Sequence, residues 1–296
     1  MRFHSIVLII SLGLFGSSVV LGQADRGTLD TSPQLFIITT NSGGQFIGTI
    51  LKQDAREILI ETKDKGQVVI PKYEVKDMHE IKAREVNGNG DYIPEEIFAT
   101  RYFITTNGLP MEKGESYVLW NLYGPEIHFG VAKNFSLGLM TSWVGIPIVG
   151  SAKYTFNISE KVNFGLGTLA GFGSWAAPDF VVALPYGALT IGDRRSNINF
   201  SGGYGMAAYD GYSGGATLFS IGAIAKLGKN TSFVFDSFFY VEDNAGSSNG
   251  VYGILIPGVR VHGKNDGAFQ FGFSGLYGEG QFVPVPVPML GWFKKL

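Results

Sequence analysis

Five ionisable residues in the last two-thirds of the chain could act together on a small solute: Glu126, His128, Lys153, Asp236 and Arg260. Glu126 and His128 are two positions apart, so their side chains share one face if the segment is a β-strand. Such a set could form a charged constriction that selects a small solute, or an internal acid/base pair. The simpler expectation is a plug of paired charges that fills a narrow interior.

Catalysis is not expected from these residues. A lipid-active hydrolase would need a Ser–His pair with an orienting partner, placed where acyl chains can reach it. His128 is expected to point inward, His262 lies beside a short turn, and no G-x-S-x-G sequence occurs. The chain has no Cys and no cluster of residues at metal-ligand spacing. We therefore assign no catalytic residue, metal or cofactor, and a lipid-active enzyme is the least favoured function.

The elements that must position these residues are β-strands. From residue 116 onward, segments of about ten residues alternate apolar with small or polar side chains, which is typical of a transmembrane β-barrel. Phe269, Phe271 and Phe273, for example, oppose Gln270 and Gly272. The apolar set is predicted to face lipid and the other set the lumen. Twelve strands are expected, at 116–123, 126–132, 135–143, 147–156, 162–171, 180–191, 196–207, 216–227, 231–241, 251–262, 268–277 and 282–293.

Turns of two kinds separate these segments. Short charged turns such as Lys133-Asn134 and Asp193-Arg194-Arg195 follow the even-numbered strands, and longer connections rich in Gly, Ser and aromatic residues lie between them. Single-chain bacterial barrels have an even strand number and short turns on the periplasmic rim. Aromatic residues cluster near both rims, as in the interfacial belts of membrane proteins. The alternative, a soluble β-sandwich, would more often place its Phe residues in the middle of strands.

The composition agrees with a membrane-embedded β-protein. Charged residues make up 16%, aromatic residues 14%, and 42 of the 296 residues are Gly. Beyond the N-terminal segment, no stretch approaches the roughly 18 uninterrupted apolar residues of a membrane helix. The net charge is −2 without a basic tract, so nucleic acid is not an expected partner.

The N-terminal third differs in character. Residues 1–24 combine Arg2 and His4 with an apolar stretch and a small-residue site, which predicts a secretory signal peptide. Residues 33–82 predict a small SH3-like or Sm-like β-module of five strands in the periplasm. Its edges, within residues 35–81, could bind a periplasmic partner by strand addition, although a spacer is the simpler expectation. Residues 83–115 are predicted to be a linker, because turn residues occur there without a period.

Three prolines near the C-terminus, Pro284, Pro286 and Pro288, alternate with valines. At this spacing all three would direct their nitrogen toward one neighbouring strand, and each removes a donor from that seam. Either the run lies above the membrane and the membrane strand begins near Met289, or the seam is weak and opens laterally for an apolar ligand. The first interpretation is the simpler one.

Several short motifs of small, turn and aromatic residues recur from residue 116 onward. They are Gly124-Pro125-Glu126, Phe129-Gly130-Val131, Asn134-Phe135-Ser136-Leu137-Gly138, Pro185-Tyr186-Gly187, Ser201-Gly202-Gly203-Tyr204-Gly205 and Phe269-Gln270-Phe271-Gly272. In these motifs residues 116–296 resemble uncharacterised outer-membrane β-barrel proteins of Gram-negative bacteria. The resemblance implies a location in outer-membrane lipid and insertion by the barrel assembly machinery, and no activity. The chain departs from many such barrels by ending on Leu296 instead of an aromatic residue.

Together these features predict an all-β protein of the bacterial outer membrane, with a periplasmic module preceding a barrel of about twelve strands. The favoured function is a narrow passive channel or a binding site for small solutes. The alternative is an anchoring barrel that presents the module to a partner.

Overall fold

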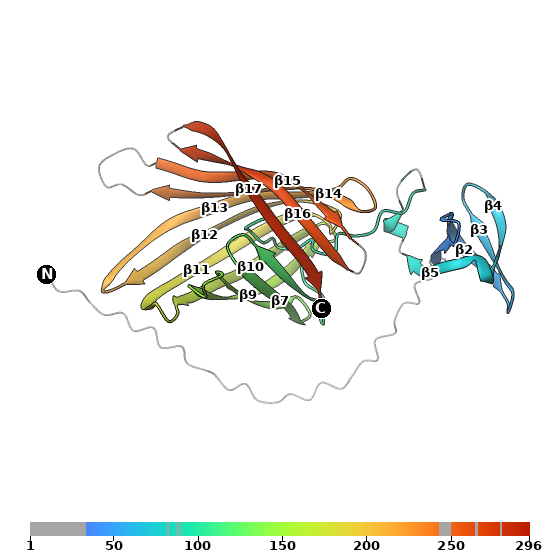
Figure 1. Ribbon diagram of the computed structural model, residues 1–296, viewed down its shortest axis with the longest axis horizontal. Coiled ribbons are helices and arrows are strands. Elements are labelled where there is room, and N and C mark those ends of the chain that lie inside the picture. Colours follow the sequence, from blue (N-terminus) through green and yellow to red (C-terminus); the bar gives the residue numbers. More distant parts are fainter. Residues whose placement is uncertain are drawn as a thin grey trace, which may run out of the picture.

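The computed structural model describes residues 34–296, except 82, 87, 89, 243–249, 264, 265 and 279. The predicted signal peptide and most of the predicted long connection after residue 242 lie outside this range. The described residues form two separate antiparallel sheets (Figure 1). None of their helices is long and apolar enough to cross a membrane.

The first sheet is a five-stranded module. Its elements are β1 (Leu35–Thr40), β2 (Gln45–Gln53), β3 (Glu57–Thr62), β4 (Gly66–Pro71), the 3-10 helix η1 (Lys72–Glu74) and β5 (Val75–Ile81). The strand order is β4-β3-β2-β1-β5, so the chain returns beside its first strand and leaves β4 and β5 at the edges. Alternate isoleucines on one face, including Ile38, Ile58 and Ile60, form its core. Burial of such alternating residues is what drives a short-strand sheet to fold.

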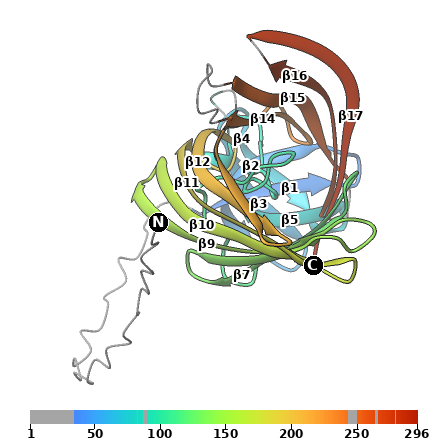
Figure 2. The ribbon, with the colours of Figure 1, turned by 90° about the vertical axis from the view of Figure 1, so that its left-hand side faces the viewer.

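The second sheet closes into a barrel of twelve antiparallel strands (Figure 2). These strands are β6 (Ser116–Asn121), β7 (Pro125–Ala132), β8 (Phe135–Thr141), β9 (Ile148–Ser159), β10 (Val162–Gly173), β11 (Ala177–Gly192), β12 (Ser196–Tyr209), β13 (Tyr212–Lys226), β14 (Thr231–Glu242), β15 (Gly250–His262), β16 (Gly267–Gly278) and β17 (Gln281–Lys295). The last strand pairs with the first, from Gly291 opposite Asn121 to Lys295 opposite Tyr117. The predicted fold, a twelve-stranded antiparallel barrel preceded by a small β-domain, is confirmed.

The barrel strands have an apolar outer face and a polar inner face. Leu137, Phe200 and Phe273 are exposed on the outside, whereas Asn199 and Gln270 are buried inside. The period of two residues in a strand produces this separation directly from the sequence. The outer face therefore offers the apolar surface that a lipid bilayer requires.

Turn chemistry fixes the register of the hairpins. In the two-residue turn between β7 and β8, Asn134 has φ 66°, a left-handed conformation that Asn adopts more readily than most residues. Asp210, in the tight turn between β12 and β13, has φ 48°. The turn at Asn134 was predicted as a short turn, whereas Asp210 was expected within one of the longer connections, between strands that end at 207 and begin at 216. Strands β12 and β13 extend instead to a two-residue turn there.

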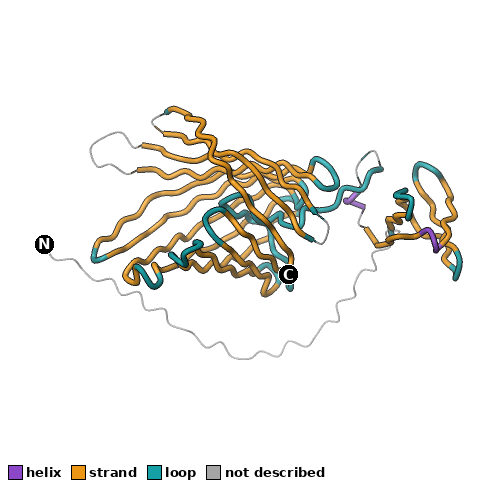
Figure 3. The backbone as a smooth tube through the Cα atoms, in the orientation of Figure 1, coloured by secondary structure: helices purple, strands orange, loops and turns teal. Residues whose placement is uncertain are grey.

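The segment between the sheets does more than connect them. Its first part, which includes the 3-10 helix η2 (Ala83–Glu85) and a bridge between Val86 and Tyr92, continues from the module. Its second part enters the barrel as a loop (Figure 3). The predicted linker, residues 83–115, therefore contains a stretch that packs inside the barrel.

Candidate functional site

Residues 96–111, here called the lumen plug, occupy the inside of the barrel. Glu96, Phe98, Ala99, Tyr102 and Asn107 are 0% exposed, and most of their neighbours in the plug are almost as deeply buried. The plug adds no strand to the barrel and is held instead by side chains and isolated backbone contacts. Such a loop needs partners for its many backbone groups, because they are removed from water.

Glu96 joins the plug to the strands on one side. Its carboxylate accepts hydrogen bonds from Ser232, from His262 at 2.7 Å and from Arg260 at 3.3 Å, and Lys226 Nζ lies 3.6 Å away. Burial alone would raise the pKa of the Glu96 carboxyl, but the charge of Arg260 and the hydrogen bond from His262 hold it well below its usual range. Glu96 is thus an ionised carboxylate inside the barrel.

Arg260 extends this contact along the plug. Its guanidinium donates to the carbonyl oxygens of Phe98 at 2.8 Å and Arg101 at 2.6 Å, and to Gln270 Oε1 at 2.7 Å. It also stacks on the ring of Phe293, with 4.5 Å between guanidinium carbon and ring centroid. One strand residue therefore satisfies two plug carbonyls and one plug carboxylate, which is a use to which the five donors of Arg are suited.

A second ion pair lies across the lumen. Arg101 of the plug donates to Glu126 Oε1 at 2.6 Å, and the same oxygen accepts from Asn121 and Tyr123. His128 Nε2 lies 3.0 Å from the other carboxylate oxygen. Glu126 therefore has charged and polar partners on all sides, as a buried carboxylate requires.

The plug backbone is also bound by Asp236 and Lys153. Asp236 accepts from the backbone N–H of Ile104 at 2.6 Å and of Thr105 at 2.9 Å, and from the Thr105 hydroxyl. Lys153 Nζ donates to the carbonyl oxygens of Asn107 at 2.7 Å and Leu109 at 2.9 Å. The carboxylate of Asp236 thus accepts from plug donors, and the ammonium group of Lys153 donates to plug acceptors.

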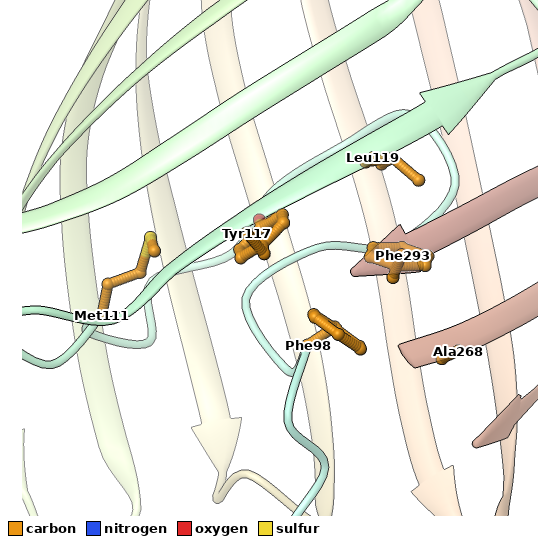
Figure 4. Close-up of a cluster of buried hydrophobic side chains, with 6 residues drawn as sticks. All are labelled: Phe98, Met111, Tyr117, Leu119, Ala268 and Phe293. Atoms are coloured by element: carbon orange, nitrogen blue, oxygen red, sulfur yellow. The ribbon is translucent and has the colours of Figure 1, made fainter. Parts of the chain in front are cut away.

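Apolar packing completes the seat of the plug. Phe98 and Met111 form one cluster with Tyr117, Leu119, Ala268 and Phe293 of the barrel (Figure 4). Tyr102 and Phe103 form another with residues of β13, β14 and β15. Their rings lie against lumen glycines, because a Cβ at Gly222 would come within 2.4 Å of Tyr102. Glycine on the strand provides the space that the aromatic ring fills.

Four of the five candidate residues, Glu126, Lys153, Asp236 and Arg260, are buried in this arrangement, and His128 is partly exposed. Glu126, Lys153, Asp236 and Arg260 bind the plug directly, and His128 binds Glu126. The structure does not bring the five into one cluster: Asp236 and Arg260 hold one side of the plug, and Glu126, His128 and Lys153 the other. Glu96 and Arg101 were missed because they lie in the predicted linker. Apolar residues beside them, such as Phe98, were a signal that this segment is not a solvated connection.

A cavity of about 270 Å³ lies on the side of the plug toward the longer loops. Plug residues including Arg101 and Thr105 form its floor, together with His128 and Lys153. Apolar side chains of the strands line its walls: Met140, Leu169, Leu184, Leu218 and Phe238. This arrangement can hold a small molecule with a polar group directed toward the plug.

The structure places the proline run in β17. Pro288 lies opposite Phe273 of β16, and the register between the two strands shifts beyond Ser274. Pro284 and Pro286 belong to the same strand. The run is therefore extended backbone within β17.

We expect Asp236→Asn to loosen the plug turn at Ile104 and Thr105. The amide keeps one acceptor oxygen for the two N–H groups and can turn its NH2 toward the Thr105 hydroxyl, so what is lost is the negative charge on the acceptor, which should cost about 1 kcal/mol of plug docking. Limited proteolysis of the protein in lipid should then cut the plug faster than in the wild type. Asp210→Asn is the matched control, because Asn tolerates the left-handed conformation of that exposed turn. Equal cutting rates for the two variants would contradict the role of Asp236.

No protein-family model matches the chain, and no curated protein sequence matches it either. Among solved structures, one titled "NanC porin structure in rhombohedral crystal form" is similar at a TM-score of 0.42 and 11% sequence identity. The match covers 60% of this chain and 96% of that one.

Proposed function

We propose that the protein is an outer-membrane barrel that binds a small solute above a plug formed by its own chain. The observation that carries this proposal is the position of residues 96–111, which fill the lumen toward the short turns and leave a cavity of about 270 Å³ beyond them. A free channel would need an aqueous path, whereas this lumen contains ion pairs and aromatic side chains. Binding, or passage that requires displacement of the plug, therefore fits better than open diffusion.

The proposed setting follows from the outer surface. Exposed apolar side chains such as Leu137, Phe200 and Phe273 fit contact with outer-membrane lipid, and insertion would use the barrel assembly machinery. The module precedes the plug along the chain, so we place it in the periplasm, at the rim with short turns. The role is non-catalytic: the titratable groups inside the barrel are engaged in holding the plug.

An anchoring role for the barrel is the second candidate, and the open sheet of the module favours it. Strands β4 and β5 lie at the sheet edges. An extended segment of a periplasmic partner could pair with either edge by strand addition. This role is compatible with a plugged barrel, because an anchor needs no open lumen.

Removal of the plug tests the proposed function. In planar bilayers we expect the wild type to show little steady conductance. A variant in which a Gly/Ser linker replaces residues 96–111 should conduct at least about tenfold more, since a twelve-stranded barrel lies between a filled and an open size. A variant that lacks residues 34–81 but keeps the plug is the control and should stay silent. Large, ungated conductance of the wild type would contradict the proposal.

A further inference from the structure

The barrel wall is low on one side. Strands β6, β7 and β8 contain 6, 8 and 7 residues, whereas β9 to β17 contain 12 to 16. A strand needs about 9–11 residues to cross the hydrocarbon core at the usual tilt. Strand β6 starts level with the end of β17 at the short-turn rim, where Tyr117 lies opposite Lys295, and it ends at Asn121, so it falls short toward the long-loop rim. Strand β8, in contrast, is level with β9 at the long-loop end, where Thr141 lies opposite Ile148, and falls short at the short-turn rim.

Strand β17 stands beside this low wall with an edge that β6 does not cover. Pairing with β6 involves only Gly291 to Lys295, so from Leu290 back to Gln281 no β6 residue lies opposite. The barrel is thus closed at its base, and above Asn121 its wall has an unpaired seam, here called the lateral gap, between β17 and the end of β6.

Pro288 belongs to the edge that faces this gap. Lys295 N–H donates toward β16, at Asp266, and Leu296 N–H donates toward β6, at Ser116. In this regular stretch the backbone nitrogens of even-numbered residues are therefore directed toward β6, and Pro288 is one of these residues. Pro284 and Pro286 are also even-numbered. A missing N–H costs no ladder hydrogen bond where there is no partner strand, and proline also prevents another strand from pairing there.

The cavity offers an anion-binding floor beneath apolar walls. Arg101, His128 and Lys153 line the floor, against one carboxylate, Glu126. Lys153 forms no ion pair among the described residues and donates two of its three N–H groups, both to carbonyls. Arg101 Nε is buried and has no hydrogen-bond partner. Buried donors of positive residues without acceptors favour an anion in this space.

We propose that the lateral gap admits single-chain amphiphiles with an acidic head group from the outer leaflet into the cavity. The head group binds at Lys153 and Arg101, and the acyl chain runs past Met140 of β8, on the side of the cavity nearer the gap. A cavity of about 270 Å³ holds the head and part of a chain, so the rest of the chain stays in the gap among lipid. This inference rests on the proposed function and names the ligand class of the same cavity.

Photolabelling tests the position of the chain. The full-length protein in phosphatidylcholine nanodiscs is irradiated with a long-chain fatty acid that carries a diazirine close to its carboxylate, and the labelled peptides are identified by mass spectrometry. We expect labels on lumen-facing residues such as Met140, Leu184 and Leu218, and competition by oleate. Leu184→Trp should abolish lumen labelling by filling the cavity, whereas Leu189→Trp, on the outer face of the same strand, should leave it unchanged. Labels confined to outer-face residues would overturn the proposal.

Head-group selection tests the anion site. Oleate and oleyl alcohol compete for the labelled site, and the ratio of their affinities is measured. Lys153→Met should weaken oleate about tenfold more than oleyl alcohol, because only oleate loses a charge-assisted hydrogen bond, whereas any shift of the plug carbonyls that Lys153 binds acts on both ligands. Lys161→Met, in an exposed turn, is the control and should keep the wild-type ratio. An unchanged ratio in Lys153→Met, or equal loss of both ligands, would overturn the assignment of the head group.

A water-soluble acid separates this inference from the proposed function. Hexanoate binding is measured by calorimetry on the wild type and on Leu184→Trp. If hexanoate binds the wild type but not Leu184→Trp, while the diazirine fatty acid does not label the lumen, the solute site stands and the amphiphile route is wrong. If neither ligand binds in the cavity, both proposals fail.

Discussion

Replacing Arg260 by Ala should release the lumen plug from one side of the barrel. The substitution leaves the carbonyls of Phe98 and Arg101 without their donor and weakens the pairing of the buried Glu96 carboxylate. Removing one partner of a buried ion pair costs about 3–5 kcal/mol. The chain has no Cys, so a single Met111→Cys reporter, at a position only 3% exposed, can be followed without background. If the substitution destabilises the docked plug by this amount, the rate of maleimide labelling of this thiol should rise by at least about a hundredfold.

The matched control is Arg56→Ala in the module. Arg56 is exposed and lies far along the chain from the barrel, so the same chemical change should leave the labelling rate of the reporter at its wild-type value. Equally slow labelling in Arg260→Ala and in the wild type would mean that Arg260 does not hold the plug.

Replacing Gly222 by Val should displace Tyr102, and shortening Tyr102 should restore the fit. A Cβ at position 222 would come within 2.4 Å of the tyrosine ring, which is fully buried and cannot move aside freely. Overpacking of this kind costs about 1–3 kcal/mol. Tyr102→Ala alone should also destabilise the plug, since a large buried side chain is lost. The double variant should be less damaged than the sum of the two single variants, by about 1–3 kcal/mol of coupling.

The reporter at Met111→Cys measures both single variants and the double variant as opening free energies. Gly202→Val is the control, because Gly202 lies on the outer face and the nearest atom to an added Cβ is a carbonyl oxygen at 3.8 Å. If the effects of Gly222→Val and Tyr102→Ala on the opening free energy were strictly additive, the ring of Tyr102 would not rest on Gly222 in solution.

The barrel was predictable because apolar and polar side chains alternate with a period of two residues along its strands. In β16, Phe269, Phe271 and Phe273 alternate with Gln270 and Gly272, and this alternation follows from strand geometry and from the different solvents on the two faces. The closing of the sheet was predictable from the even number of segments and from the two kinds of turn. Strand ends were less so, since the strands around the longer loops extend further than the alternation shows: β11 spans Ala177–Gly192 and was expected at 180–191.

The lumen plug could not be predicted in the same way, because its apolar and polar residues alternate with no regular period. Residues such as Glu96 and Arg101 are bound from different strands, up to 166 positions apart in the case of Glu96 and His262. Pairings at this distance depend on the closed shape of the barrel, which brings inward side chains of many strands around one loop. The five inward ionisable residues were identified from their faces, but their partners were not.

The proline run shows which part of strand pairing a local sequence pattern can predict. Its spacing alone predicts that Pro284, Pro286 and Pro288 address one neighbouring strand. Whether a partner lies on that side depends on the length of β6, which ends at Asn121. The alternation in this first barrel strand is poor, so its end could not be placed from sequence.

The position of residues 96–111 is the claim on which the solute site and its anion-binding floor both depend. Hydrogen–deuterium exchange of the full-length protein in nanodiscs measures it without substitutions. Backbone N–H groups of Ile104, Thr105 and Gly108 donate to Asp236 and Thr190 inside the barrel, so peptides that cover the plug should exchange at least about a hundredfold more slowly than an unprotected chain. Exchange of residues 96–111 at the rate of a free linker, with the barrel strands protected, would contradict the account.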